Sequence, residues 1–207
     1  LSGPTFAIEV ARGLPAAVTL ACYDTAVGER LCEDLRTPKF RAYKSDDLIG
    51  AEIGGSVKNV LAIACGIIEG RGLGNNARAA LITRGLMEMA RLCVAKGGRP
   101  ETLMGLSGIG DLMLTCNAMQ SRNFSLGVEL GHGQGLSNIL NKRKSVAEGV
   151  DTASAISSLA DRIGLDMPIC RAVNTILNGN KSIDEAISQL LARPVGSDSP
   201  LDVKSHF

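Results

Sequence analysis

Apolar residues in the first part of the chain form short runs separated by polar turns. Residues 16–22 are one such run, bounded by a proline and an aspartate, and this pattern predicts a buried strand. Asp24 or Thr25 could cap a helix that continues to about Leu35, and residues 40–43 predict a second short strand. Strand, helix and strand in this order are typical of a parallel βαβ unit. The first part of the chain therefore predicts the end of an α/β domain.

After the two aspartates at 46–47, apolar positions recur at helical spacing instead. Residues 57–68 and 81–93 each place apolar side chains three or four positions apart, which predicts two helices. Glycines and prolines separate further segments of this kind, and no alternating strand pattern of any length follows. The sequence thus predicts a mainly α protein, with the end of an α/β domain in residues 1–47 and an all-helical domain in residues 48–207.

Composition and charge exclude several classes of partner. The 207 residues carry 22 basic and 21 acidic side chains, a net charge of +1, which gives no general electrostatic reason to bind nucleic acid or an anionic membrane. Aromatic residues make up 3% with no tryptophan, which argues against a platform for stacking bases. The longest purely apolar stretch, residues 60–65, is far short of the roughly 20 residues that span a bilayer. We therefore expect no nucleic acid partner and no membrane span.

The cysteines and the first residues bear on metal binding and location. Six cysteines lie far apart, with no CxxC pair and no nearby histidine to complete a zinc set, so we expect reduced thiols and no metal site. The chain begins at Leu1 without a methionine and without the features of a secretory signal. We expect it to be the later part of a longer cytoplasmic protein.

One apparent nucleotide-binding pattern fails on inspection. Residues 72–77 fit G-x-G-x-x-A, but the preceding run has helical periodicity, and no acidic residue follows about 20 positions later to bind ribose. A turn between two helices is the better interpretation.

Residues 54–60 place a lysine and an asparagine beside two glycines in an otherwise apolar helix. For an arbitrary lysine, a position on the wet face of an amphipathic helix is the ordinary interpretation. Here valines flank Lys58 and Asn59, and the glycines permit close approach of a ligand. Because a partly desolvated lysine gives up its proton more readily than one in water, Lys58 is a candidate to exchange a proton with a substrate oxygen.

Two later segments carry polar groups suited to a small anionic substrate. Asp111 and Thr115 lie four residues apart, hence on one helical face, and Asp111 could orient the Lys58 ammonium. A first-turn acid favoured by the helix dipole is the alternative. Residues 120–124 combine an arginine with short polar donors, which suits a phosphate because a guanidinium offers two parallel hydrogen bonds. A solvated surface turn is the alternative there.

Taken together, these segments resemble the bacterial-type NAD(P)-dependent glycerol-3-phosphate dehydrogenases over most of the chain. The matching segments, in the family's order, are LSGPTFA (1–7), GGSVKN (54–59), NARAALITRG (76–85), GIGDL (108–112), QSRN (120–123) and VAEG (146–149). The resemblance implies a Rossmann-type domain, of which residues 1–47 would be the C-terminal remnant, and a substrate domain like the C-terminal domain of 6-phosphogluconate dehydrogenases. It further implies reversible reduction of dihydroxyacetone phosphate to sn-glycerol 3-phosphate with NAD or NADP, for phospholipid synthesis, in a cytoplasmic homodimer.

The same likeness gives the site residues their expected roles. Lys58 is the proton donor to the ketone oxygen. The substrate-binding residues are Gly3, Thr5, Lys58, Asn59, Asp111, Thr115, Ser121, Arg122 and Asn123, and the cofactor-binding residues are Ala7, Arg122, Val146 and Glu148. The chemistry agrees with this division, because hydride arriving at C2 leaves charge on oxygen that Lys58 can neutralise, while Arg122 on the unreactive phosphate aligns C2.

The family's glycine-rich phosphate loop would lie upstream of Leu1, so we expect the 207-residue chain by itself to be inactive. Two alternatives remain open. One is a related two-domain dehydrogenase of the 6-phosphogluconate or hydroxyacid type, which also uses a lysine. The other is a helical dimerisation module that has kept the fold and lost catalysis.

Overall fold

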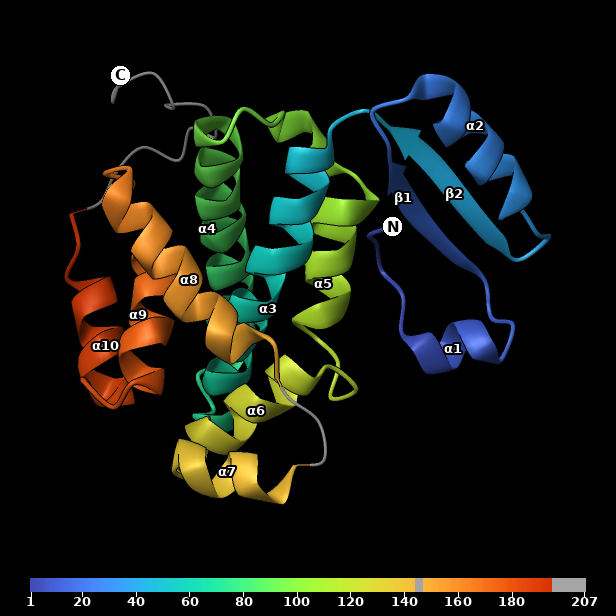
Figure 1. Ribbon diagram of the computed structural model, residues 1–207. Coiled ribbons are helices and arrows are strands. Elements are labelled where there is room, and N and C mark those ends of the chain that lie inside the picture. Colours follow the sequence, from blue (N-terminus) through green and yellow to red (C-terminus); the bar gives the residue numbers. More distant parts are fainter. Residues whose placement is uncertain (144–146, 195–207) are drawn as a thin grey trace.

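A computed structural model describes residues 1–143 and 147–194 of the chain. It has a small α/β unit beside a larger helical part (Figure 1). The elements are α1 (Ala7–Ala11), β1 (Ala16–Ala21), α2 (Thr25–Asp34), β2 (Phe40–Ser45), α3 (Leu48–Gly70), α4 (Gly74–Ala95), the 3-10 helix η1 (Pro100–Met104), the π-helix η2 (Leu106–Gly110), α5 (Asp111–Thr115), α6 (Arg122–Gly131), α7 (Leu136–Lys142), α8 (Gly149–Arg162), α9 (Pro168–Leu177) and α10 (Ile183–Leu191). The predicted mainly α architecture is confirmed.

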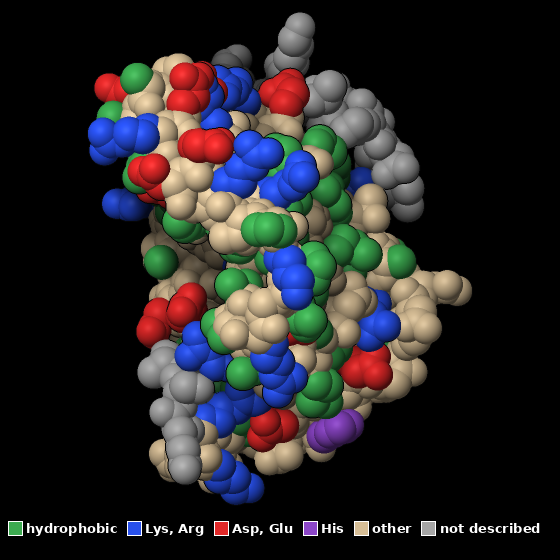
Figure 2. Space-filling model, turned by 90° about the vertical axis from the view of Figure 1, so that its right-hand side faces the viewer, with side chains coloured by type: hydrophobic (Ala, Val, Ile, Leu, Met, Phe, Trp, Pro, Cys, Tyr) green, Lys and Arg blue, Asp and Glu red, His purple; other side chains and the backbone are tan. Residues whose placement is uncertain are grey.

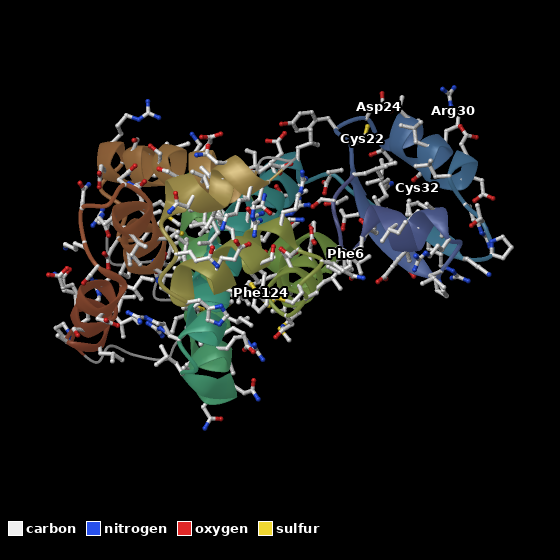
Figure 3. All side chains as sticks on the ribbon, turned by 90° about the horizontal axis from the view of Figure 1, so that it is seen from below. Phe6, Cys22, Asp24, Arg30, Cys32 and Phe124 are labelled. Atoms are coloured by element: carbon white, nitrogen blue, oxygen red, sulfur yellow. The ribbon has the colours of Figure 1, made fainter. Side chains whose placement is uncertain are left out.

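The α/β unit is the predicted βαβ arrangement. β1 and β2 pair in parallel, with Ala16 opposite Phe40 and Ala21 opposite Ser45, and α2 forms the crossover between them. The side chain of Asp24 caps α2 by accepting a hydrogen bond from the backbone amide of Val27 over 2.9 Å. In Figure 3 the labelled Asp24 lies in this unit near Cys22, and Arg30 lies farther from the helical part.

The long helix α3 is the centre of the helical part, and other helices surround it (Figure 1). Its side chains from Val57 to Ile68 are almost all buried, apart from Lys58. By length and composition alone α3 could cross a membrane, but 72% of its apolar window is buried inside the protein. It is therefore the core helix of a globular packing arrangement.

Helix α6 lies against α3 in the same direction and in a fixed register. A Cβ atom at Gly127 would lie 2.1 Å from the carbonyl oxygen of Ile63, and one at Gly131 would lie 2.7 Å from that of Ile67. One turn earlier, Asn123 contacts Asn59. Because each α6 position pairs with the α3 position 64 residues before it, this register brings residue 122 level with residue 58.

Several short elements were not predicted from the sequence. They are α1, η1 and the π-helix η2, whose backbone includes a hydrogen bond from the amide of Gly110 to the carbonyl of Gly105. The turn between helices expected at residues 72–77 lies at residues 71–73, because α3 ends at Gly70 and residues 74–77 already belong to α4. The elements α1, η1 and η2 are each too short to show a hydrophobic repeat that could be recognised in the sequence.

Candidate functional site

The ammonium of Lys58 and the carboxylate of Asp111 meet between α3 and α5. Lys58 Nζ donates to Asp111 Oδ2 over 2.5 Å, and Thr115 Oγ1 donates to Asp111 Oδ1 over 3.3 Å. The side chain of Asp111 is 4% exposed and that of Lys58 20%, so the carboxylate is enclosed while the lysine side chain is partly open to solvent. Burial raises the pKa of the Asp111 carboxyl above its ordinary value, although the nearby ammonium of Lys58 acts in the opposite direction.

A second group of polar side chains joins α3, α6 and α8. Asn123 Nδ2 donates to Asn59 Oδ1 over 3.0 Å, and Asn123 Oδ1 accepts from the backbone amide of Gly149 over 3.0 Å. Asn59 Nδ2 in turn lies 3.4 Å from Glu148 Oε2. Both asparagines are buried, and their hydrogen bonds fix the start of α8 beside the helix that carries Lys58.

Arg122 is exposed at the first turn of α6. Ser121 caps this helix by accepting a hydrogen bond from the amide of Phe124 over 3.2 Å. An Arg122 nitrogen lies 3.6 Å from Glu148 Oε1, with side chains 54% and 67% exposed. An ion pair this exposed is worth about 0–1 kcal/mol, so little free energy is lost when Arg122 turns to another anion.

Of the first residues of the chain, Gly3 lies near Asp111. The backbone of Ser2 exchanges two hydrogen bonds with that of Thr19 in β1, and the neighbouring amide of Gly3 is close enough to Asp111 to lower the pKa of its carboxyl. Thr5 Oγ1 donates to the carbonyl of Gly3 over 3.3 Å. Ala7 is exposed at the start of α1. Val146 lies outside the described residues.

The arrangement can perform two chemical tasks. The ammonium of Lys58, on a partly exposed side chain and held by a buried carboxylate, can give a proton to an oxygen or stabilise negative charge on it. The exposed guanidinium of Arg122 can hold a phosphate by two parallel hydrogen bonds. Because α3 and α6 run in register, residues 58 and 122 lie at the same level of neighbouring helices.

Sequence reasoning did not find two buried carboxylates. Asp47 accepts three hydrogen bonds at the start of α3, where the sequence suggested only a change of pattern. Glu88, on α4, is 1% exposed and accepts two backbone hydrogen bonds from the first turn of α9. An acid just before a helical run is a recognisable capping signal for Asp47. No local pattern signals Glu88, because its partners lie about 80 residues away.

Other features lie apart from this site. All six cysteines are unpaired, and Cys65, Cys93, Cys116 and Cys170 are buried. Within the described ranges 1–143 and 147–194, no three His, Cys, Asp or Glu side chains are grouped to hold a metal ion. One cavity of about 130 Å³ lies between α9 and α10, and another of about 380 Å³ lies beside α2 and β2. Neither cavity is lined by Lys58, Asp111 or Arg122.

Comparison with known proteins gives a consistent result. The family described as NAD-dependent glycerol-3-phosphate dehydrogenase C-terminus matches residues 47–188. A glycerol-3-phosphate dehydrogenase [NAD(P)+] from Rhodospirillum rubrum is 60% identical over 205 residues, which are 97% of this chain and 59% of that protein. One of the same name from Maricaulis maris is 60% identical over 194 residues, 94% of this chain and 58% of that protein.

Two solved structures are similar in fold. The structure of glycerol-3-phosphate dehydrogenase from Coxiella burnetii matches with a TM-score of 0.89 and 46% identity, over 93% of this chain and 59% of that one. A yeast glycerol-3-phosphate dehydrogenase matches with a TM-score of 0.81 and 27% identity, over 91% of this chain and 58% of that one. The chain thus spans somewhat under two thirds of the length of these relatives.

Proposed function

Since the chain belongs to the NAD-dependent glycerol-3-phosphate dehydrogenase family, we propose that it provides the substrate-binding and catalytic part of such an enzyme. The reaction is reversible hydride transfer between NAD(P)H and C2 of dihydroxyacetone phosphate, which gives sn-glycerol 3-phosphate for phospholipid synthesis. The family match argues against the alternative of a 6-phosphogluconate or hydroxyacid dehydrogenase.

The contact between Lys58 and Asp111 is the observation that carries this proposal. Bound NAD(P)H supplies the hydride that reaches C2. Lys58 then gives a proton from Nζ to the oxygen on which charge develops, and takes it back from the hydroxyl in the reverse direction. Asp111 keeps the ammonium oriented over 2.5 Å, and Thr115 holds the carboxylate from its other oxygen.

The substrate phosphate is assigned to Arg122, with Ser121 beside it. Ser121 Oγ accepts a hydrogen bond as the helix cap, which leaves its own O–H free to donate. Asn123 Nδ2 donates one hydrogen to Asn59 and has a second to donate to a substrate oxygen, whereas Asn59 Nδ2 already donates to the Gly55 carbonyl and to Glu148 and would exchange one of these bonds for the substrate. Gly3 and Thr5 complete the proposed substrate site, because the amide of Gly3 lies next to Asp111.

The cofactor is NAD or NADP, and its proposed contacts in this chain are Ala7, Arg122, Val146 and Glu148. The chemistry of the described groups fits one edge of a dinucleotide: the guanidinium of Arg122 suits a phosphate and the carboxylate of Glu148 suits a hydroxyl donor, and both are more than half exposed. The resemblance to the family assigns Arg122 to both the cofactor and the substrate.

The proposed division into domains is residues 1–47 for the α/β part and 48–207 for the helical substrate domain. It is supported by the end of β2 at Ser45 and the start of α3 at Leu48. The side of the molecule that carries the α/β unit has apolar side chains among charged ones (Figure 2). In this unit Leu1 and Tyr23 are more than 70% exposed, as expected if further chain of the nucleotide-binding domain packs there. A cytoplasmic homodimer is proposed on the likeness to the family.

Replacement of Lys58 tests the proposed function. In the complete protein, with the N-terminal part that its relatives have, Lys58→Ala should lower kcat for NAD(P)H oxidation with dihydroxyacetone phosphate about 10²- to 10⁴-fold, the usual range for loss of a general acid. Lys96→Ala, at an exposed position after α4, is the matched control and should stay within about twofold of the parent rate. A rate unchanged by Lys58→Ala would favour a non-catalytic helical module.

The 207-residue chain made by itself should be inactive. Because the proposed cofactor contacts within it form only one edge of the dinucleotide site, the chain alone lacks the affinity to hold the cofactor at C2. Steady-state turnover of NADPH with dihydroxyacetone phosphate by the purified chain would contradict this expectation. A preference of the complete protein for a carboxylated sugar phosphate would contradict the proposed substrate.

A further inference from the structure

One face of α3 packs along the segment 99–111 from the start of the helix up to Lys58. The two stretches of chain run in the same direction and touch at three successive levels. The contacts, in order along α3, are Gly50 with Thr102, Gly54 with Ser107, and Lys58 with Asp111. Lys58 and Asp111 are therefore the last contact in a series, and the earlier ones decide where Asp111 meets the helix.

Two glycines allow the first two contacts. A Cβ atom at Gly54 would lie 2.1 Å from the carbonyl oxygen of Ser107, and one at Gly50 would lie 2.9 Å from Cβ of Thr102. Real Cβ atoms are not found at such separations, so any side chain here would push the two segments apart. The close approach of segment 99–111 to α3 thus depends on both glycines.

The carboxylate of Asp47 fixes the start of this contact. Its Oδ1 accepts from the amide of Gly50 over 2.9 Å, which caps α3. Its Oδ2 accepts from the amide of Arg99 over 2.9 Å and from Thr102 Oγ1 over 2.6 Å. Asp47 is only 7% exposed, and these hydrogen bonds to Oδ2 come from the opposite segment. One side chain therefore joins the first turn of α3 to η1.

The spacing of the contacts differs between the two segments. On α3 the contacts follow every four residues, at 50, 54 and 58, whereas on the other segment they fall at 102, 107 and 111. Within the first interval, of five residues, the chain passes from η1 to η2 through Gly105, whose backbone is extended at φ −96° and ψ −164°. The second interval, of four residues, lies mostly in the π-helix η2, where the amide of Gly110 bonds to the carbonyl of Gly105, and it ends with Asp111 at Lys58.

We propose that Asp47 and Thr102 are positioning residues for the reaction: they fix the register of segment 99–111 on α3 and so place the Asp111 carboxylate opposite the Lys58 ammonium. This inference rests on the proposed function for its effect on rate. Neither residue needs to touch the substrate, because both act through the contact that orients Lys58. The phosphate grip of Arg122 is built separately, on the glycine contacts between α3 and α6.

The test compares three substitutions at threonine in the complete protein. Thr102→Val removes the donor to Asp47 at nearly constant shape, Thr102→Ser keeps it, and Thr83→Val is the matched control because Thr83 is exposed and bonds only within α4. Steady-state assays with NADPH and dihydroxyacetone phosphate give kcat and KM. Thr102→Val should lower kcat about 10- to 100-fold, as expected for a displacement near 1 Å, and change KM less than about threefold.

The remaining variants decide between positioning and simple stability. Both Thr102→Ser and Thr83→Val should have a kcat within about twofold of that of the parent protein. Asp47→Asn, which keeps the shape and loses the charge, should shift kcat in the same direction as Thr102→Val and serves if that variant folds poorly. A melting temperature lowered by Thr102→Val, with kcat intact well below it, would overturn the proposal, as would a change confined to KM.

A second measurement does not depend on activity. Acetic anhydride modifies free lysine amines, and mass spectrometry of the digested protein gives the rate at Lys58 alone. That rate should rise several-fold in Thr102→Val, because the Asp111 carboxylate no longer holds the ammonium, and should not change in Thr83→Val. If the parent protein has no dehydrogenase activity but this rate still rises, the proposed function fails and the register stands. If the parent is active and the rate is unchanged, the register inference fails alone.

Discussion

Glu88 is a buried acid that bonds to the start of another helix. Its Oε1 accepts from the amide of Ile169 over 2.6 Å and its Oε2 accepts from that of Cys170 over 3.1 Å. Both amides belong to the first turn of α9, whose N-cap residue, Met167, offers no side-chain hydrogen bond. The carboxyl therefore replaces the missing cap from α4 and ties the two helices together.

The protonation of Glu88 makes the stability of the fold depend on pH. Burial raises the pKa of this carboxyl to about 7 from an ordinary value of 4.5, although the two amides act in the opposite direction. Because the folded state holds the proton more tightly than the unfolded chain, the stabilisation is complete below pH 4.5 and is lost as the pH rises to about 7. At about 1.4 kcal/mol for each pKa unit, the difference amounts to about 3 kcal/mol.

Urea denaturation of the complete protein at several pH values between 4.5 and 8 measures this dependence. Glu88→Gln keeps the shape of the side chain but cannot titrate, so the free energy of unfolding of the parent relative to this variant should fall by about 3 kcal/mol over that range. Glu101→Gln, at an exposed acid, is the control and should follow the parent. Parallel curves for the parent and Glu88→Gln would refute the argument that burial controls this group.

Two further predictions concern the contact of α6 with α3 and the phosphate grip. Gly127→Ala would put a Cβ atom 2.1 Å from the carbonyl oxygen of Ile63, so we expect the free energy of unfolding to fall by about 1–3 kcal/mol in urea titrations. Gly110→Ala, where the nearest atom would lie 3.6 Å away and the backbone is already helical, should leave it unchanged or raise it by less than about 1 kcal/mol, and equal effects would contradict the packing argument. Arg122→Lys keeps the charge but loses the planar fork, so kcat/KM for dihydroxyacetone phosphate should fall roughly 10- to 100-fold, mainly through KM. An unchanged KM would contradict the proposal that Arg122 binds the substrate phosphate.

The local parts of this structure could be predicted from the sequence. The buried strand from Ala16, the cap at Asp24 and the parallel partner strand from Phe40 follow from short-range patterns of apolar and capping residues. The shared face of Asp111 and Thr115 follows from their spacing of four residues, and their hydrogen bond confirms it. These features involve neighbours in sequence, which is why a single sequence is enough.

The parts that arise from long-range packing could not be predicted. The π-helix η2 before Asp111 packs against α3, and its five residues carry no hydrophobic repeat that signals it. The hydrogen bonds that Glu88 accepts from α9 span about 80 residues, and the one that Asn123 donates to Asn59 spans 64. The contact of Lys58 with Asp111 was expected from the likeness to a family together with their chemistry, and its distance came only from the fold.

The burial of the cysteines determines where thiol reagents can react. Burial raises the pKa of Cys93 to about 11 and that of Cys170 well above its usual range, so little thiolate forms at neutral pH. Cys22 and Cys32 are partly exposed, and both lie in the α/β unit (Figure 3). A maleimide dye added to the folded protein therefore labels that unit and leaves the helical core unmodified, which offers a fluorescent reporter of its movement without engineering a new cysteine.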